Sequence, residues 1–109
     1  MDLNQPNRYK VLVVPRAHRE TIYDLDDDLA AAIFQVTVKL SRAVRAVSGC
    51  DGLNIIQANG RAGQQDVFHF HLHILPRFFD DSIVFGWDFT QIDRDELDQL
   101  AADIRTYLQ

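Results

Sequence analysis

The sequence has little of several features that would otherwise classify it. It contains a single cysteine, Cys50, so no disulfide can form within the chain, and we expect it to reside in a reducing cytoplasm. No apolar run approaches the roughly 20 residues of a membrane-spanning helix. The first residues lack the basic start and apolar stretch of a signal peptide. The sequence therefore gives no sign of a disulfide scaffold or of a membrane span, and it shows no internal repeat.

Positive charge is also in deficit. The chain has 11 Lys and Arg residues against 16 Asp and Glu residues, a net charge of −5. General affinity for nucleic acid or for an anionic membrane needs a dense basic surface, so we expect neither as a partner. The acidic residues gather at 24–28 and 93–98, which is typical of helix starts. A small anionic substrate held by a local site is compatible with this distribution.

What is present favours one domain, because 109 residues leave no room for two independent cores. We predict that it spans residues 1–109. The apolar run 10–14 predicts a buried strand that ends at Pro15. The stretch 26–48 predicts a helix, and Gly49 is suited to end it. The apolar stripe of this helix consists of Leu29, Ile33, Val36, Leu40, Val44 and Val47.

The second half of the chain predicts two strands and another helix. A strand over 53–57 and a histidine-rich strand flank the glycine- and amide-rich loop 59–65. Two strands so close in sequence suit an antiparallel hairpin, which favours an α+β fold over a wound α/β fold. A final helix is predicted over about 94–108, with Asp93 at its start as in a capping box.

Three of the four histidines alternate within the run 67–75. Alternation predicts a strand with His69, His71 and His73 on one face. The opposite face would be apolar, formed by Phe68, Phe70, Leu72 and Ile74. Histidine titrates near neutrality and acts as metal ligand, base, acid or nucleophile. The alternative is a plain solvent-facing strand that carries imidazoles, but such clustering favours a functional site.

Two kinds of chemistry fit the histidine face. Alternate strand residues lie about 6.5–7 Å apart, whereas zinc–nitrogen bonds are about 2.0–2.1 Å long. All three histidines therefore cannot reach one ion without a sharp bend, and His18 is the only other histidine. A neutral imidazole can instead attack an electrophile through one ring nitrogen while an acceptor holds the other. The glycine-rich loop can form an anion-binding concavity, which points to chemistry on a phosphate.

The segment 60–77 closely resembles the signature of the histidine-triad (HIT) family, His-φ-His-φ-His-φ-φ, in which φ is apolar. The run 11–18 and the strand 52–57 extend the resemblance over about residues 2–89 to Hint- and Fhit-like members of bacterial type. It implies an antiparallel sheet with one long helix and a C-terminal helix, in a homodimer. It also implies hydrolysis or transfer of nucleoside phosphate conjugates, such as phosphoramidates and dinucleoside polyphosphates. That chemistry passes through a covalent nucleotidyl-histidine, with no cofactor and no metal for the attack.

The resemblance assigns roles to individual residues. His71, the middle histidine, would be the nucleophile, and His73 would contact the phosphate. His69 would support the site through packing and its backbone carbonyl. Gln65 matches the loop glutamine near the phosphate, and Asp2 falls where the family holds the ribose hydroxyls of a purine nucleotide. A further match, His18, suits a surface or dimer position at least as well.

Three positions depart from the family pattern. Lys10 stands where a histidine supports the nucleophile, Ala58 where a polar side chain is usual, and Asp66 where Ser or Thr is usual. A carboxylate beside a phosphate is repulsive unless it points away or is protonated. Lys10 would either offset Asp66 or pair with the phosphate, so we place both in the substrate-binding region.

The usual first hairpin and short helix of the family do not precede Asp2, which indicates a longer natural reading frame or a shortened member. The three departures leave a nucleotide-binding protein with little catalysis as one alternative function. A metal-binding protein that uses the histidine strand is the other.

Overall fold

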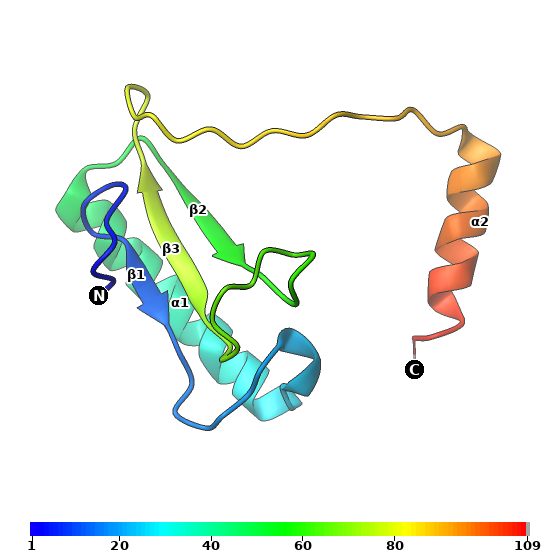
Figure 1. Cartoon of the computed structure of the whole chain (residues 1–109), viewed down its shortest axis with the longest axis horizontal. Coiled ribbons are helices and arrows are strands. Elements are labelled where there is room, and N and C mark those ends of the chain that lie inside the picture. The colour runs from blue at the N-terminus through cyan, green and yellow to red at the C-terminus, as the bar shows by residue number, and fades with distance from the viewer. Residues whose placement is uncertain (109) are drawn as a thin grey trace.

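The computed structural model describes residues 1–108, and Gln109, the last residue of the predicted domain, lies outside them. The elements in chain order are β1 (Val11–Val13), the 3-10 helix η1 (Ile22–Asp24), α1 (Asp27–Ser48), β2 (Gly52–Gln57), β3 (Leu72–Arg77) and α2 (Arg94–Arg105). The strands form one antiparallel sheet in the order β1-β3-β2, and α1 lies across one face of it (Figure 1). The predicted α+β fold, with an antiparallel sheet and one long helix, is confirmed.

Local signals explain both ends of α1. The Asp26 carboxylate accepts a hydrogen bond from the Leu29 N–H at 2.8 Å, which satisfies one of the free donors of the first turn. Gly49 follows the helix with φ of 64°, a left-handed conformation that glycine adopts without steric cost. The helix predicted over 26–48 therefore forms with Asp26 and Gly49 as its caps.

The face of α1 that packs on the sheet differs from the predicted stripe at two positions. Ile33 and Val44 are buried as expected, but Val36 and Val47 are 46% and 59% exposed. Val36 lies about 60° around the helix from Ile33, which turns it away from the sheet. Thr37 takes the buried place, and its hydroxyl donates to the Ile33 carbonyl at 2.8 Å. The prediction was wrong for Val36 and Val47, the latter in the last turn of the helix.

The histidine-rich strand begins later than predicted. β3 runs from Leu72 to Arg77 and includes Pro76, whereas residues 67–69 form a bend and residues 70–71 are irregular. Phe70, Leu72 and Ile74 are buried in the core as predicted. Phe68 is 40% exposed, so its prediction as a core-facing residue was wrong. The strand alternation therefore holds only from Leu72 onward, and the two earlier histidines are placed by loop geometry.

β3 is the central strand, and its two faces have different roles. Ile74 is fully buried on the face that α1 covers. His73 lies on the opposite face, where it pairs in register with Leu12 of β1 and with Ile56 of β2. Side chains alternate between the faces of a strand, so burial of Ile74 under α1 directs His73 to the uncovered side.

The C-terminal part of the chain extends away from the sheet. Residues 82–93 form an extended connection, and α2 contacts no other helix or strand of residues 1–108 (Figure 1). α2 ends at Arg105 rather than at the predicted 108. The radius of gyration is 16.8 Å, whereas a compact chain of this length has about 13 Å. No helix of the described residues is both long and apolar enough to cross a membrane.

An ion pair holds the turn that follows β3. The Arg77 guanidinium donates to both carboxylate oxygens of Asp81, at 2.8 and 2.9 Å. Asn7 donates to the same carboxylate at 3.0 Å and to the Pro76 carbonyl at 2.8 Å. The Arg77 hydrogen bonds, followed by those of backbone N–H groups and Asn7, hold the pKa of the Asp81 carboxyl far below its ordinary value. This cluster ties the N-terminal segment to the end of β3.

We predict that Asp81→Asn lowers the free energy of unfolding at neutral pH and weakens its acid dependence. A carboxyl with a lowered pKa in the folded state stabilises the fold above the unfolded pKa of about 3.8, and this stability is lost as pH falls below it. Urea unfolding from neutral pH into the acid range measures both effects. Asp80→Asn, at an exposed neighbouring position, is the control. Equal acid dependence in wild type and Asp81→Asn would contradict the prediction.

Candidate active site

A pocket of about 440 Å³ opens on the face of the sheet that α1 leaves uncovered. This volume lies within the range of small-molecule sites. It is lined by Asp2, Asn4, Lys10, Leu12, Val14, Pro15, Asp66, Val67, His69, His71 and His73. Six of the seven predicted site residues are therefore brought together, and Gln65 is not among them.

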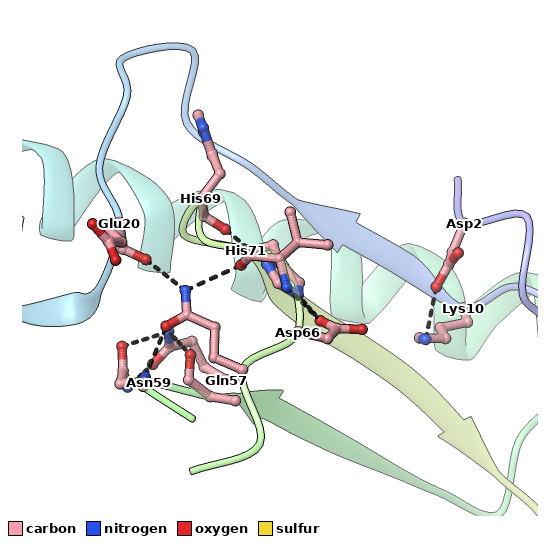
Figure 2. A network of polar contacts seen from close by, with 12 residues as sticks. Asp2, Lys10, Glu20, Gln57, Asn59, Asp66, His69 and His71 are labelled. Carbon is pink, nitrogen blue, oxygen red and sulfur yellow. Dashed lines mark hydrogen bonds and ion pairs between the residues drawn. The ribbon is translucent and has the colours of Figure 1, made fainter. Parts of the chain in front are cut away.

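The imidazole of His71 is held by a backbone carbonyl. Its Nδ1 lies 2.8 Å from the carbonyl oxygen of His69. A carbonyl oxygen only accepts, so Nδ1 carries the hydrogen and the neutral ring keeps its lone pair on Nε2. The side chain is 13% exposed, and Nε2 lies 3.6 Å from Oδ1 of Asp66 (Figure 2). The arrangement gives His71 a nucleophilic or basic nitrogen at the pocket.

The ring of His69 points toward a different set of partners. Its Nε2–H donates to the Pro15 carbonyl at 2.9 Å, so its Nδ1 accepts from His18 Nδ1 at 3.2 Å. The ring centroids of His18 and His69 are 5.1 Å apart. His69 therefore contributes its carbonyl to His71, while its ring joins the segment after β1. Sequence reasoning did not identify the His18 contact, because the pairing depends on how residues 15–20 fold back.

His73 lies next to His71, with ring centroids 5.1 Å apart. Burial, with smaller effects from the charges of Lys10 and His71, lowers the pKa of His73. Its Nδ1 is buried and has no hydrogen-bond partner among the described residues. Leaving a buried polar atom without a partner is costly. The ring is thus held neutral at neutral pH in the floor of the pocket.

Asp2 and Lys10 form an ion pair at the pocket. The Lys10 ammonium lies 2.7 Å from the Asp2 carboxylate, and the two side chains are only 13% and 16% exposed. The Lys10 hydrogen bond, with a further one from the Asn4 N–H, lowers the pKa of the Asp2 carboxyl. Lys10 thus partners Asp2 rather than Asp66, and its positive charge is largely neutralised.

Gln65 supports the loop from behind the pocket. It is 4% exposed, and its amide nitrogen donates to the carbonyls of Glu20 and Val67 at 2.7 and 3.1 Å. Its side-chain oxygen accepts the Gly60 N–H at 2.8 Å. These bonds use the polar atoms of Gln65 within the chain, so a direct contact of Gln65 with phosphate stays a prediction.

The loop before the histidines is closed by its own backbone. The N–H groups of Gln64 and Gln65 donate to the carbonyls of Arg61 and Gly60. A Cβ at Gly63 would lie 2.6 Å from the Asn59 carbonyl oxygen, so the turn needs glycine there. Asn59 also accepts the Ile22 N–H at 2.7 Å and ties the loop to η1. The N–H groups of Gln64 and Gln65 are therefore not directed at an anion, and an anion-binding concavity in this loop stays a prediction.

A metal would need ligands that converge on one point. Among residues 1–108, no group of three or more His, Cys, Asp or Glu side chains is arranged to hold an ion. The rings of His71 and His73 lie together, whereas His69 turns toward His18.

Comparisons with known proteins agree on one family. The family model described as the HIT domain matches residues 2–80. The chain is 38% identical over 78 residues to a Bacillus subtilis protein named Protein hit, a match covering 72% of the chain and 54% of that relative. It is 27% identical over 110 residues to a Schizosaccharomyces pombe protein named adenosine 5′-monophosphoramidase, covering all of the chain and 80% of that protein. A crystal structure of a HIT family member from Bacillus subtilis matches the whole chain and 79% of its own length, with TM-score 0.94 and 31% identity.

We predict that Lys10→Met raises the pKa of His73. The ammonium opposes protonation of the nearby imidazole, and its loss also leaves the Asp2 carboxylate free to stabilise the imidazolium. Titration of the histidine ring protons by NMR measures the pKa. Arg16→Met removes a cation at an exposed position outside the pocket lining and should leave the pKa of His73 unchanged. An unchanged pKa of His73 in Lys10→Met would show that the ion pair of Lys10 and Asp2 does not influence this ring.

Proposed function

We propose that this chain, which belongs to the HIT family, hydrolyses or transfers nucleoside phosphate conjugates through a nucleotidyl group carried on His71. The observation that carries the proposal is the bond from His71 Nδ1 to the His69 carbonyl. It leaves the Nε2 lone pair free at a pocket of suitable size. The name of the fission yeast relative supports a nucleoside phosphoramidate as a substrate.

In the first step, His71 Nε2 supplies the electron pair of a new nitrogen–phosphorus bond. The bond from phosphorus to the leaving group breaks, its electron pair departs with that group, and the group takes up a proton from water. In the second step, water attacks the phosphorus, the nitrogen–phosphorus bond returns its electrons to Nε2, and the water releases its proton. A neutral ring whose other nitrogen is already bonded to a carbonyl suits both steps.

Neighbouring residues would hold the substrate. His73, neutral and next to His71, is placed to contact the phosphate. Asp2 keeps its carboxylate charge through Lys10 and would accept hydrogen bonds from the hydroxyls of a ribose, as in the family. Gln65 would hold the loop that carries Asp66 in place.

We also propose a homodimer in which a second copy covers the exposed apolar surfaces. β2 is an edge strand, and Ile55 on it lines an apolar cleft of about 490 Å³ with Phe34 and Val38 of α1. The large apolar side chains after residue 83 are also exposed, among them Val84, Trp87, Phe89, Leu97, Leu100 and Ile104. Such surfaces are unusual on a monomer. The whole chain would then be one domain whose C-terminal helix packs on the partner subunit. We place this dimer in the cytoplasm, where the free thiol of Cys50 is stable.

The chain spans 54% of the length of the Bacillus subtilis relative named Protein hit.

We predict that His71→Ala abolishes turnover of an adenosine phosphoramidate while the fold and adenosine monophosphate binding persist. Loss of a nucleophile costs several powers of ten in rate, far more than loss of a positioning contact. His69→Ala and His73→Ala should be slower than wild type but faster than His71→Ala. Rapid denaturation during turnover should trap the nucleotidyl group on His71, which mass spectrometry locates.

The control for this series is Lys39→Ala, which removes an exposed side chain of α1 outside the pocket lining. Chelation with EDTA should leave the rate of turnover nearly unchanged. A loss of activity that added zinc restores would instead favour a metal-binding function. Equal activity of His71→Ala and wild type would overturn the mechanism. Adenosine monophosphate binding without turnover of phosphoramidates or dinucleoside polyphosphates would favour a binding protein.

We predict that the wild-type chain sediments as a dimer at micromolar concentration and that Ile55→Glu shifts it toward monomer. A carboxylate in the apolar cleft between α1 and β2 would be desolvated by a partner, which is costly. Tyr23→Glu, at an 86% exposed position in η1, is the matched control. A monomeric wild type would contradict the assembly.

A further inference from the structure

The charges that line the pocket do not balance. Asp2 and Lys10 neutralise each other at 2.7 Å. Asp66 is then the one lining residue whose formal charge no Lys or Arg of the described chain pairs. Neither Arg61, which stacks over Phe68, nor Arg77, which binds Asp81, lines the pocket. The pocket with neutral histidines therefore carries one net negative charge.

The position of this charge is set by the backbone. Oδ1 of Asp66 accepts the N–H of the following residue, Val67, at 2.9 Å. The same oxygen lies 3.6 Å from His71 Nε2 (Figure 2). The side chain lines the pocket and is 85% exposed. A phosphorus atom bonded to Nε2 would therefore lie beside the carboxylate. The group that leaves this phosphorus lies within the range over which charges interact, about 8 Å at physiological salt.

We propose that Asp66 selects substrates by the charge of the leaving group. The site favours nucleoside monophosphate conjugates of amines that carry a cation or no charge, and it disfavours conjugates whose leaving group is anionic, such as polyphosphates. This selection rests on the proposed function, because it requires a substrate phosphate at His71. A serine or threonine at this position would add no charge, so the selection belongs to this chain and not to its family pattern.

The size of the effect follows from exposure. A carboxylate in contact with solvent acts through a high effective dielectric, so each unit of charge on the leaving group should change kcat/KM by about threefold. Between a leaving group with one positive charge and one with one negative charge, the expected preference is about tenfold. The preference should shrink at about 1 M salt, where the screening length falls to about 3 Å.

The test uses three adenosine 5′-phosphoramidates whose aliphatic amines have equal length and end in an ammonium, a hydroxyl or a carboxylate. The reaction and the bond broken are the same in all three, so only charge varies. For wild type we expect kcat/KM to fall in that order, and for Asp66→Asn and Asp66→Ser we expect nearly equal values. Asp80→Asn removes the same charge at an exposed position outside the pocket and should keep the wild-type order.

The proposal would be overturned if kcat/KM falls from the ammonium to the carboxylate substrate equally in wild type and in both Asp66 variants. Equal kcat/KM for all three substrates in wild type would also overturn it. Turnover of none of the three would count against the proposed function instead. Calorimetric binding of the three compounds to His71→Ala, with and without Asp66→Asn, then decides the charge selection alone. The proposal is supported if His71→Ala binds the ammonium compound more tightly than the other two and if adding Asp66→Asn abolishes this difference. Equal binding of all three compounds to His71→Ala would overturn it.

Discussion

The hydrogen bond between His71 Nδ1 and the carbonyl of His69 determines what the pocket can do. In the neutral ring it selects the tautomer with the hydrogen on Nδ1, so the lone pair lies on Nε2 at the cavity. An alternative tautomer would direct a hydrogen at the substrate and remove the lone pair that the proposed chemistry needs. Two residues of one loop supply both partners, so the geometry depends on how that loop enters β3.

The loop is held from three directions. Buried Phe70 fastens it to the core under α1, and its N–H also bonds to the Arg19 carbonyl. Gln65 and Asn59 tie the loop to the segment around η1. On the other side, β3 places His73 between β1 and β2. The histidines therefore lie on a backbone that is fixed by packing and hydrogen bonds, which limits their rotamers. Such fixed positions are the condition for preorganised chemistry.

Electrostatic balance distinguishes this pocket from a simple phosphate site. The Lys10 ammonium forms an ion pair with Asp2, and the remaining charge is the carboxylate of Asp66 beside His71. The pocket lining therefore supplies no unpaired Lys or Arg to a polyanion. The lone carboxylate instead makes leaving-group charge a determinant of which conjugates fit. This balance arises from two positions that depart from the family pattern.

The sequence by itself determined the elements whose signals are local. The caps at Asp26 and Gly49, the 3.6-residue periodicity of α1 and the spacing of the strands predicted the α+β fold. The histidine spacing and the resemblance to the HIT family pointed to six of the residues that line the pocket. Tertiary structure decided what depends on contacts between distant segments. The late start of β3, the burial of Thr37 in place of Val36, the pairing of Lys10 with Asp2 and of His69 with His18, and the inward turn of Gln65 all have this origin. Alternation in sequence assigns side chains to one face of a sheet only where the backbone is extended. A charged or amide side chain acquires its hydrogen-bond partner only after the core has brought distant loops together.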